Sequence, residues 1–389
     1  TGNDTIYTAY TATSKKAIGQ RGDVVYGGRG TDTLVGSFNE DFLIGGEEEN
    51  NADVETDWID YSNLVLGAND YGISVNLEQT TNFTDTVDRA YLNGNYSQVF
   101  RLDTNGTNTL NFDYISQIEN ITGSSGDDTF TGNTSQNSIL AGAGDDIIYY
   151  TRGLDYYDGG NHTTSSGQGS GTPSVGGGDW ISLAKETTTT VNFDLYNNNV
   201  GANISLATVT NIENIIGYNG VQATTGWGTD SNNTFVMYAG NDSIIGRQGN
   251  DVYDLGDGND AAFTSYGNDT VIGGAGIDRL DYTNSYSGTN QANIIILTNQ
   301  DLNGDGDTAD ANETVNIQSI TVQGLATLTD GTYNFFKIRD SRTTFFDYLY
   351  READGTSDIE QFYLSNNNAY ADIFSGDADA NTVWAYAGN

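Results

Sequence analysis

Aspartate recurs at every ninth residue over long stretches of the chain, and this period constrains the fold more than any other feature of the sequence. Each of these residues follows a glycine-containing turn sequence and precedes a short apolar run. A short, fixed period is typical of solenoids, in which every repeat contributes one structural unit and stacks on its neighbours. Three series keep the interval: Asp23, Asp32 and Asp41; Asp128, Asn137, Asp146 and Asp155; and Asp242, Asp251, Asp260, Asp269 and Asp278.

The best-formed unit, Gly27-Gly28-Arg29-Gly30-Thr31-Asp32-Thr33-Leu34-Val35, follows the pattern G-G-x-G-x-D-x-U-x, where U is apolar. Glycine lets the backbone turn sharply with positive φ, and the aspartate closes the turn. The last three residues form a short strand whose apolar U points inward. Two units complete one coil, so residues 18 apart stack at the parallel-strand step of about 4.8 Å. The sequence therefore predicts an all-β, parallel β-roll or β-solenoid.

This unit resembles the RTX, or hemolysin-type, nonapeptide of secreted bacterial proteins, which is a calcium-binding β-helix repeat. The resemblance implies Ca²⁺ between stacked loops, held by aspartate carboxylates and loop carbonyls. It also implies bacterial export by type I secretion and folding outside the cell. Six same-edge pairs then indicate roughly six ions or more: Asp23 with Asp41, Asp128 with Asp146, Asn137 with Asp155, Asp242 with Asp260, Asp251 with Asp269, and Asp260 with Asp278.

The expected calcium ligands are the aspartates of the repeat loops. Asn137, Asn233 and Asn381 stand in aspartate positions, and Arg21 and Ser135 replace loop glycines, so those loops are expected to bind weakly or stay empty. A metal-free solenoid of Asx turns is the alternative, but carboxylates one strand step apart would repel one another. The ligands are Asp4, Asp23, Asp32, Asp41, Asp128, Asp146, Asp155, Asp242, Asp251, Asp260, Asp269, Asp278 and Asp372.

The charge balance independently favours a bound cation. Lys and Arg number 14 against 53 Asp and Glu, which gives a formal net charge of −39. Such a chain is not expected to bind nucleic acid or insert into a membrane. With no cysteine in the sequence, calcium must provide any cross-linking. The chain begins without Met, and both of its ends fall inside a repeat, so we expect a segment of a longer protein.

Non-repeat excursions interrupt the repeat blocks. Phrases such as Asp57-Trp58-Ile59 close a block, and phrases such as Ile118-Glu119-Asn120 open the next one. The excursions alternate like strands and are expected to form wider coils or hairpins within the same stack. The predicted order is a first RTX block at 1–62, an excursion at 63–117, a second block at 118–183 with a flexible loop at 159–178, an excursion at 184–211, a third block at 212–283, an excursion at 284–357 and a further block from 358–389.

The third excursion contains two further candidate sites. Asp301, Asn303, Asp305 and Asp307 begin an acidic loop at 301–313 that resembles an EF-hand loop, and the sequence leaves open whether it binds Ca²⁺ or is an acidic hairpin loop. The aromatic, locally basic segment 333–350 predicts a hairpin. Its side chains either pack a core or contact a neighbouring subunit or a glycan.

The sequence favours a structural role over an enzymatic one. His162 is the only histidine and lies in the predicted flexible loop, which argues against a histidine-based catalytic site. We expect a calcium-dependent structural or assembly protein of a bacterial surface, such as a surface layer, fibril or adhesin stalk, that self-associates end to end or laterally. Two alternatives stay open, namely the repeat region of a secreted carbohydrate-active enzyme of the lyase or epimerase type, and an adhesin segment that binds a cell-surface glycan.

Overall fold

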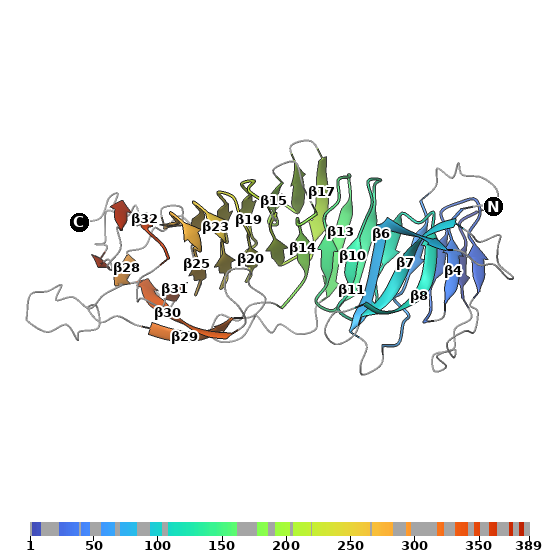
Figure 1. Ribbon diagram of the computed structural model, residues 1–389, viewed down its shortest axis with the longest axis horizontal. Helices are drawn as coiled ribbons and strands as arrows, with labels where there is room; N and C mark the ends of the chain where they lie inside the picture. Colours follow the sequence, from blue (N-terminus) through green and yellow to red (C-terminus); the bar gives the residue numbers. More distant parts are fainter. Residues whose placement is uncertain are drawn as a thin grey trace, which may run out of the picture. The chain divides into compact units, whose positions relative to one another are not determined.

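The computed structural model describes most of the chain and divides it into two compact units. Unit 1 comprises residues 1–164, 178–182 and 203–212, and unit 2 comprises 165–177, 183–202 and 213–389. Every regular element in the described part is a β-strand (Figure 1). The described residues are 2–8, 23–38, 40–46, 56–66, 71–83, 94–102, 108–161, 177–185, 191–202, 205–218, 220–264, 267–282, 293–296, 317–322, 331–340, 346–350, 358–363, 373–375 and 381–384.

Unit 1 has two sheets whose strands alternate along the chain. The first sheet is parallel, with neighbours in the order β1 (Thr5–Tyr7), β3 (Thr33–Val35), β5 (Trp58–Asp60), β9 (Asn120–Thr122), β11 (Ser138–Ala143), β13 (Tyr156–Asn161) and β17 (Ser205–Thr210). The second sheet contains the parallel pair β2 (Val24–Tyr26) and β4 (Asp41–Ile44), and the parallel run β10 (Thr129–Thr131), β12 (Ile147–Tyr149) and β14 (Trp180–Ser182).

Unit 2 repeats this plan. One sheet runs in parallel from β15 (Asn192–Asp194) through β19 (Thr225–Trp227), β21 (Ser243–Ile245), β24 (Ala261–Phe263), β27 (Arg279–Asp281) and β32 (Gln361–Tyr363) to β34 (Thr382–Trp384). The other runs from β18 (Asn214–Ile216) through β20 (Thr234–Val236), β22 (Val252–Asp254) and β25 (Thr270–Ile272) to β31 (Phe346–Tyr350). β28 (Asn293–Ile296) pairs in parallel with β33 (Ile373–Ser375), and the short loop strands β23 (Asp257–Gly258) and β26 (Ala275–Gly276) also pair.

The register follows the predicted coil of two nonapeptides. Ile139 lies opposite Tyr157 in one sheet and Phe130 opposite Ile148 in the other, each pair 18 residues apart. These four side chains are fully buried. They occupy the U position, so the prediction that U points inward is confirmed, and burying one large apolar side chain per strand supplies the core of each coil.

The excursions enter the stack as antiparallel strands. β6 (Gly72–Phe83), β7 (Gly94–Leu102) and β8 (Asn108–Ser116) form a meander that lies side by side in Figure 1, with β8 parallel to β4 and β6 parallel to β10. In unit 2, β15 pairs with β16 (Asn199–Ala202), and β29 (Ile317–Val322) pairs with β30 (Gly331–Asp340), which pairs with β31. Of the two expected forms, hairpins rather than wider coils are observed.

One predicted boundary is wrong. The flexible loop was expected to begin at residue 159, but Gly159–Asn161 complete strand β13, where Gly160 pairs with Gly142. Glycine can continue a strand when the neighbouring backbone is close, and here it does so. Residues 162–176 and the acidic loop 301–313 lie outside the described residues. In the part that is described, no helix is long and apolar enough to cross a membrane.

Candidate calcium centres

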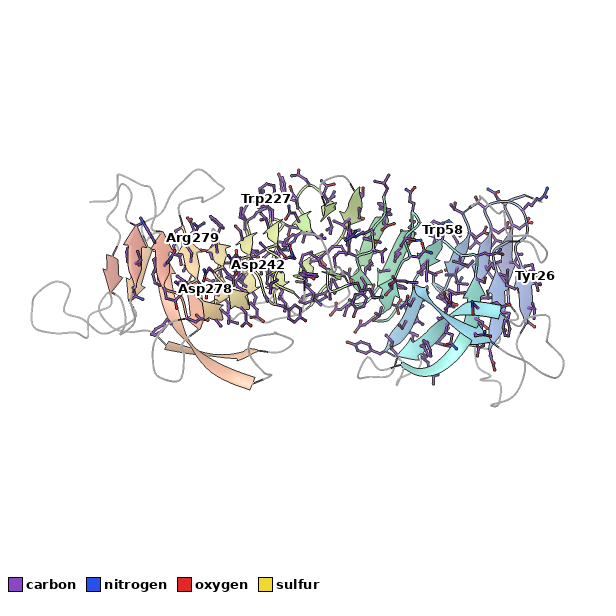
Figure 2. All side chains as sticks on the ribbon, turned by 45° about the horizontal axis from the view of Figure 1, so that its top comes forward. Tyr26, Trp58, Trp227, Asp242, Asp278 and Arg279 are labelled. Carbon is purple, nitrogen blue, oxygen red and sulfur yellow. The ribbon has the colours of Figure 1, made fainter. Side chains whose placement is uncertain are left out.

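The repeat aspartates join successive coils through their first carboxylate oxygen. In each of the six predicted pairs, the backbone N–H of the first residue donates to Oδ1 of its partner 18 residues later. The donor–acceptor distance is 2.7 Å from Asp242 to Asp260 and 2.9 Å from Asp260 to Asp278. The predicted same-edge pairs therefore stack as expected. We call these rows of side chains the aspartate ladders; Figure 2 labels Asp242 and Asp278 along the coils of unit 2.

The second carboxylate oxygen distinguishes these residues from ordinary turn aspartates. Oδ2 is buried and has no hydrogen-bond partner in four of them, namely Asp32, Asp146, Asp260 and Asp278. In the Asp32 loop, for example, Oδ2 lies over the first glycine of the loop. A Cβ atom added to Gly27 would be 2.7 Å from this oxygen. A buried carboxylate oxygen without a donor costs free energy unless a cation or a proton neutralises it. Stacked loops that present only oxygen atoms suit the hard cation Ca²⁺.

Burial favours the protonated form of several carboxylates of the ladders when no metal is bound. Burial raises the pKa of Asp146 to about 9, and the nearby Asp128 carboxylate raises it further. Burial likewise raises the pKa of Asp260 to about 8, that of Asp278 and Asp128 to about 7, and that of Asp242 to about 6. At neutral pH, Asp146 and Asp260 should therefore release protons when a divalent cation binds.

A second ladder of hydrogen bonds runs in the opposite direction. Oδ1 of Asn241 accepts the N–H of Asn259 at 2.9 Å, and Oδ1 of Asn259 accepts the N–H of Ile277 at 2.9 Å. Asn250 and Asn268 repeat the arrangement at 2.8 Å. These side chains directly precede the ladder aspartates, so the repeated Gly-Asn-Asp triplet was the sequence signal for both ladders. The asparagine bonds are made without a metal.

Several acidic residues that the nine-residue period missed extend the aspartate ladders. The nine-residue period does not reach these residues, because an excursion or an inserted loop lies between the donor and the acceptor of each hydrogen bond. The two residues are 25, 33, 62, 72 or 82 positions apart in the sequence. The recurring phrases Asp57-Trp58-Ile59, Asp179-Trp180-Ile181 and Ile118-Glu119-Asn120 were the available signal. The missed acceptors are Asp57 for Asp32, Asp179 for Asp146, Glu119 for Asp57, Asp113 for Asp41 and Glu360 for Asp278.

Two of the three loops that replace the ladder aspartate with asparagine form a hydrogen bond from the side-chain amide to a backbone carbonyl. The side-chain amide Nδ2 of Asn137 donates to the carbonyl of Glu119 at 2.7 Å, and that of Asn233 donates to the carbonyl of Glu213 at 2.7 Å. An aspartate there would place a carboxylate oxygen against a carbonyl oxygen. The amide therefore supplies the donor that this carbonyl needs, and weak binding or an empty site in these loops stays a prediction.

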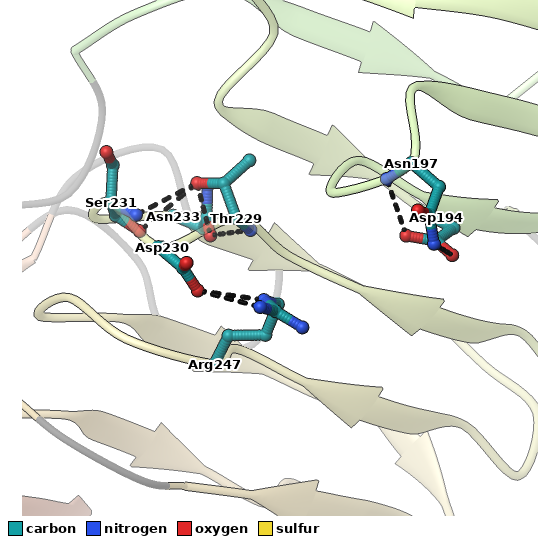
Figure 3. A network of polar contacts seen from close by, with 7 residues as sticks. All are labelled: Asp194, Asn197, Thr229, Asp230, Ser231, Asn233 and Arg247. Carbon is teal, nitrogen blue, oxygen red and sulfur yellow. Dashed lines mark hydrogen bonds and ion pairs between the residues drawn. The ribbon is translucent and has the colours of Figure 1, made fainter. Parts of the chain in front are cut away.

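A positively charged side chain lies beside the Asn233 loop. Arg247 occupies a loop position at which Gly28 and Gly274 have φ of 100° and 95°, and its own φ is 80°. Its guanidinium forms an ion pair with Asp230 at 2.9 Å (Figure 3). It also lies 3.5 Å from the ring centroid of Tyr196. An ion pair and a cation–π contact each contribute about 1 kcal/mol or less at the surface, a gain that opposes the strain of positive φ.

The structure describes twelve of the thirteen predicted repeat ligands. Asp4 joins its ladder by donating its N–H to Oδ1 of Asp32 at 2.7 Å. Asp372 and the acidic-loop residues Asp301, Asn303, Asp305 and Asp307 lie outside the described residues. Among the described residues, no group of three or more His, Asp or Glu side chains converges as a metal site. Calcium takes six to eight oxygens, and loop carbonyls and water are suitable ligands beside carboxylates.

Parallel coils joined by aspartate ladders define a calcium-binding β-roll. The family of the RTX calcium-binding nonapeptide repeat, described in units of four copies, matches residues 19–50, 122–157, 227–262, 263–281 and 367–389. The chain thus carries RTX repeats, which bind Ca²⁺, are not themselves catalytic and are typical of proteins secreted to the extracellular space. No curated protein matches the chain.

Proposed function

We propose that this chain is a calcium-folded structural segment of a bacterial cell surface, acting in a surface layer, a fibril or an adhesin stalk. One observation carries the proposal: eight carboxylates in the described part combine a raised pKa with a hydrogen bond accepted from the backbone of a neighbouring coil. These residues are Asp113, Asp128, Asp146, Asp155, Asp242, Asp260, Asp278 and Asp358.

The hydrogen bonds that these carboxylates accept from backbone amides favour a structural role over a catalytic one. In a carbohydrate-active enzyme, a carboxylic acid with a raised pKa faces the substrate and donates a proton. Here the corresponding residues are buried within loops and point at backbone amides, as Asp146 does toward Asp128 at its N–H. The raised pKa values are accounted for by burial and stacking, so they give no support to the lyase or epimerase alternative.

Calcium would act as the folding switch of such a segment. Extracellular calcium-binding modules typically have dissociation constants of about 10⁻⁴ to 10⁻³ M, well above cytosolic calcium. Before export, the 53 acidic side chains of the chain would repel one another, and after export calcium would neutralise the ladders. Folding is thereby delayed until the protein reaches the surface.

The test is a calcium titration from chelator, followed by far-UV circular dichroism and by electron microscopy, with magnesium as the matched control cation. Magnesium requires a small octahedral shell and retains its waters, so it should not replace calcium. Calcium-dependent β-structure together with ordered polymers supports the proposal. A calcium-folded chain that stays monomeric at all concentrations would exclude self-assembly by this segment, and a fold insensitive to chelator would exclude calcium as the switch.

A specific surface feature favours glycan binding as the second candidate. On one sheet of unit 2, Trp227 is paired with Ile245 and Ile245 with Phe263 on successive coils, and Trp227 is 37% exposed. The guanidinium of Arg279 lies 4.9 Å from the ring centroid of Phe263. Exposed aromatic rings are suited to stacking on sugar rings. Retention of the calcium-loaded protein in affinity gels that contain neutral polysaccharide, lost in Trp227→Ala, would support this role.

In the predicted aromatic hairpin, β30 and β31 pair as expected. Phe336, the one residue of this hairpin whose side chain is described, is buried at 1% exposure. At this position, core packing is therefore the better interpretation.

A further inference from the structure

The third excursion ends at a junction where the parallel stack resumes. β27 and β32 pair in parallel, with Leu280 opposite Phe362. The N–H of Gln361 donates to the carbonyl of Asp278 at 2.8 Å, and the N–H of Asp278 donates to Oε2 of Glu360 at 2.7 Å, across 82 residues of sequence. The chain therefore returns from a long insertion to a fixed register.

Asp358 is the residue at this junction whose environment the repeat does not explain. It is 4% exposed, and its Oδ2 accepts the N–H of Gly273 at 2.7 Å and of Gly274 at 3.2 Å. Its Oδ1 is buried and has no hydrogen-bond partner. If the only role of Asp358 were to cap these two amides, a single oxygen would be sufficient, and the other would remain buried without a donor, which destabilises the fold.

Asp278 presents a second such oxygen to the same loop. It is fully buried, its Oδ1 accepts the N–H of Asp260, and its Oδ2 has no partner. A Cβ atom added to Gly273 would lie 2.8 Å from this Oδ2, so the Asp278 and Asp358 carboxylates flank one glycine. Two buried carboxylates in this arrangement require a cation or protons.

We propose that Oδ2 of Asp278 and Oδ1 of Asp358 are the two carboxylate ligands of a calcium ion that fixes the return of the third excursion. Asp278 belongs to the repeat segment 263–281, whereas Asp358 lies outside every matched segment, so Asp358 is a ligand that the nonapeptide pattern does not supply. Loop carbonyls and water complete the six to eight oxygens that calcium takes. Glu360 is not a third ligand through Oε2, because that atom holds the Asp278 amide. The site does not depend on any role in surface assembly.

The asparagine loops show how this chain closes a loop without a metal. Asn137 and Asn233 each donate from the amide Nδ2 to a backbone carbonyl of a neighbouring coil at 2.7 Å. Their Oδ1 lies over the first glycine of the loop, where Asp278 has Oδ2. Asp358 keeps a carboxylate, although asparagine could cap Gly273 and Gly274 equally well through its own Oδ1. The charge itself therefore needs an explanation, and a divalent cation shared with Asp278 provides one.

The test counts ions in the whole protein. Asp358→Asn retains the cap on the two glycine amides and removes the charge, and Glu40→Gln removes one exposed charge elsewhere as the control. Equilibrium dialysis against saturating ⁴⁵Ca²⁺ should show about one ion fewer in Asp358→Asn and no change in Glu40→Gln. An unchanged count and unchanged affinity in Asp358→Asn would overturn the proposal and leave Asp358 as an amide cap.

A measurement on the wild-type protein keeps the proposal open to refutation if the variant does not fold. Hydrogen–deuterium exchange is followed during a calcium titration, in peptides that contain Gly273 and Gly274 and in peptides that contain Asp358. Both should gain protection with the same calcium midpoint, because one ion joins them. Separate midpoints, or protection of only one peptide, would contradict a shared ion.

Discussion

The backbone N–H of Asp242 donates to Oδ1 of Asp260 at 2.7 Å, while Oδ2 of Asp260 is buried without a hydrogen-bond partner. The two oxygens of one carboxylate thus have different roles. Oδ1 fixes the register between coils with or without a metal, and Oδ2 requires a cation or a proton. This division explains how one side chain can both define the stack and make its stability depend on calcium.

Replacing Asp260 with asparagine should have opposite effects on stability in the absence and in the presence of calcium. The side-chain oxygen can still accept the Asp242 amide, and an amide group takes the place of the unpartnered oxygen. In chelator at a pH above about 8, where Asp260 is ionised, we expect the free energy of unfolding to rise by about 1–3 kcal/mol, the cost of a buried unsatisfied group. In saturating calcium, the stabilisation by the metal should fall instead. Urea unfolding under both conditions measures the two changes, and destabilisation of equal size in both would refute this division of roles.

The metal-free protein should lose stability as pH rises. The pKa values of Asp242, Asp278, Asp260 and Asp146 are about 6, 7, 8 and 9 in the fold, against 3.8 for an ordinary aspartate. Between these limits the unfolded chain binds fewer protons than the folded one, so the stabilisation is complete below pH of about 4 and is lost progressively up to about 9.

Calcium should invert this pH profile, because the metal competes with protons for the same oxygens. Thermal unfolding followed by circular dichroism, in chelator and in excess calcium across this pH range, provides the measurement. A metal-free melting temperature that increases from acid to neutral pH would show that the ladder aspartates are not protonated in the fold.

The sequence was sufficient to predict the coil but not every member of the ladders. The nine-residue period placed Asp242, Asp260 and Asp278 on one edge because no residues intervene to disturb the count. Asp113 and Asp358 were missed because each accepts a backbone amide from a residue far away in sequence, 72 residues for Asp113 and 85 for Asp358. Only the fold shows that these insertions return to the same register. The neutral loops at Asn137 and Asn233 were recognised as departures, but the carbonyl that each amide meets could not be inferred.

Converting Asn233 to aspartate should create a calcium-dependent loop. The substitution replaces the Nδ2 donor to Glu213 with an oxygen that faces a carbonyl, so unfolding in chelator should become easier by about 1–3 kcal/mol. Excess calcium should restore most of this loss, and dialysis should detect about one additional ion. Asn233→Ala serves as the control, since it removes the donor without adding a ligand and should not respond to calcium. The same result for both variants would show that the loop cannot hold an ion.

Alanine substitutions at two glycines of one loop should distinguish the effect of backbone strain from the effect of close contact between coils. Gly28 and Gly30 have φ of 100° and 124°, so alanine is strained at both, by about 1–3 kcal/mol. A Cβ at Gly28 would meet no atom within 4 Å, whereas one at Gly30 would lie 2.6 Å from the backbone carbon of Gly2 in the adjacent coil. Backbone atoms of a parallel stack cannot move independently, so Gly30→Ala should be the more destabilising variant. It should also require a higher calcium concentration to fold. Gly28→Ala should lower the stability by the strain alone. Parallel calcium titrations of the two variants by circular dichroism measure the difference, and equal midpoints would mean that close approach between coils does not limit the packing of this loop.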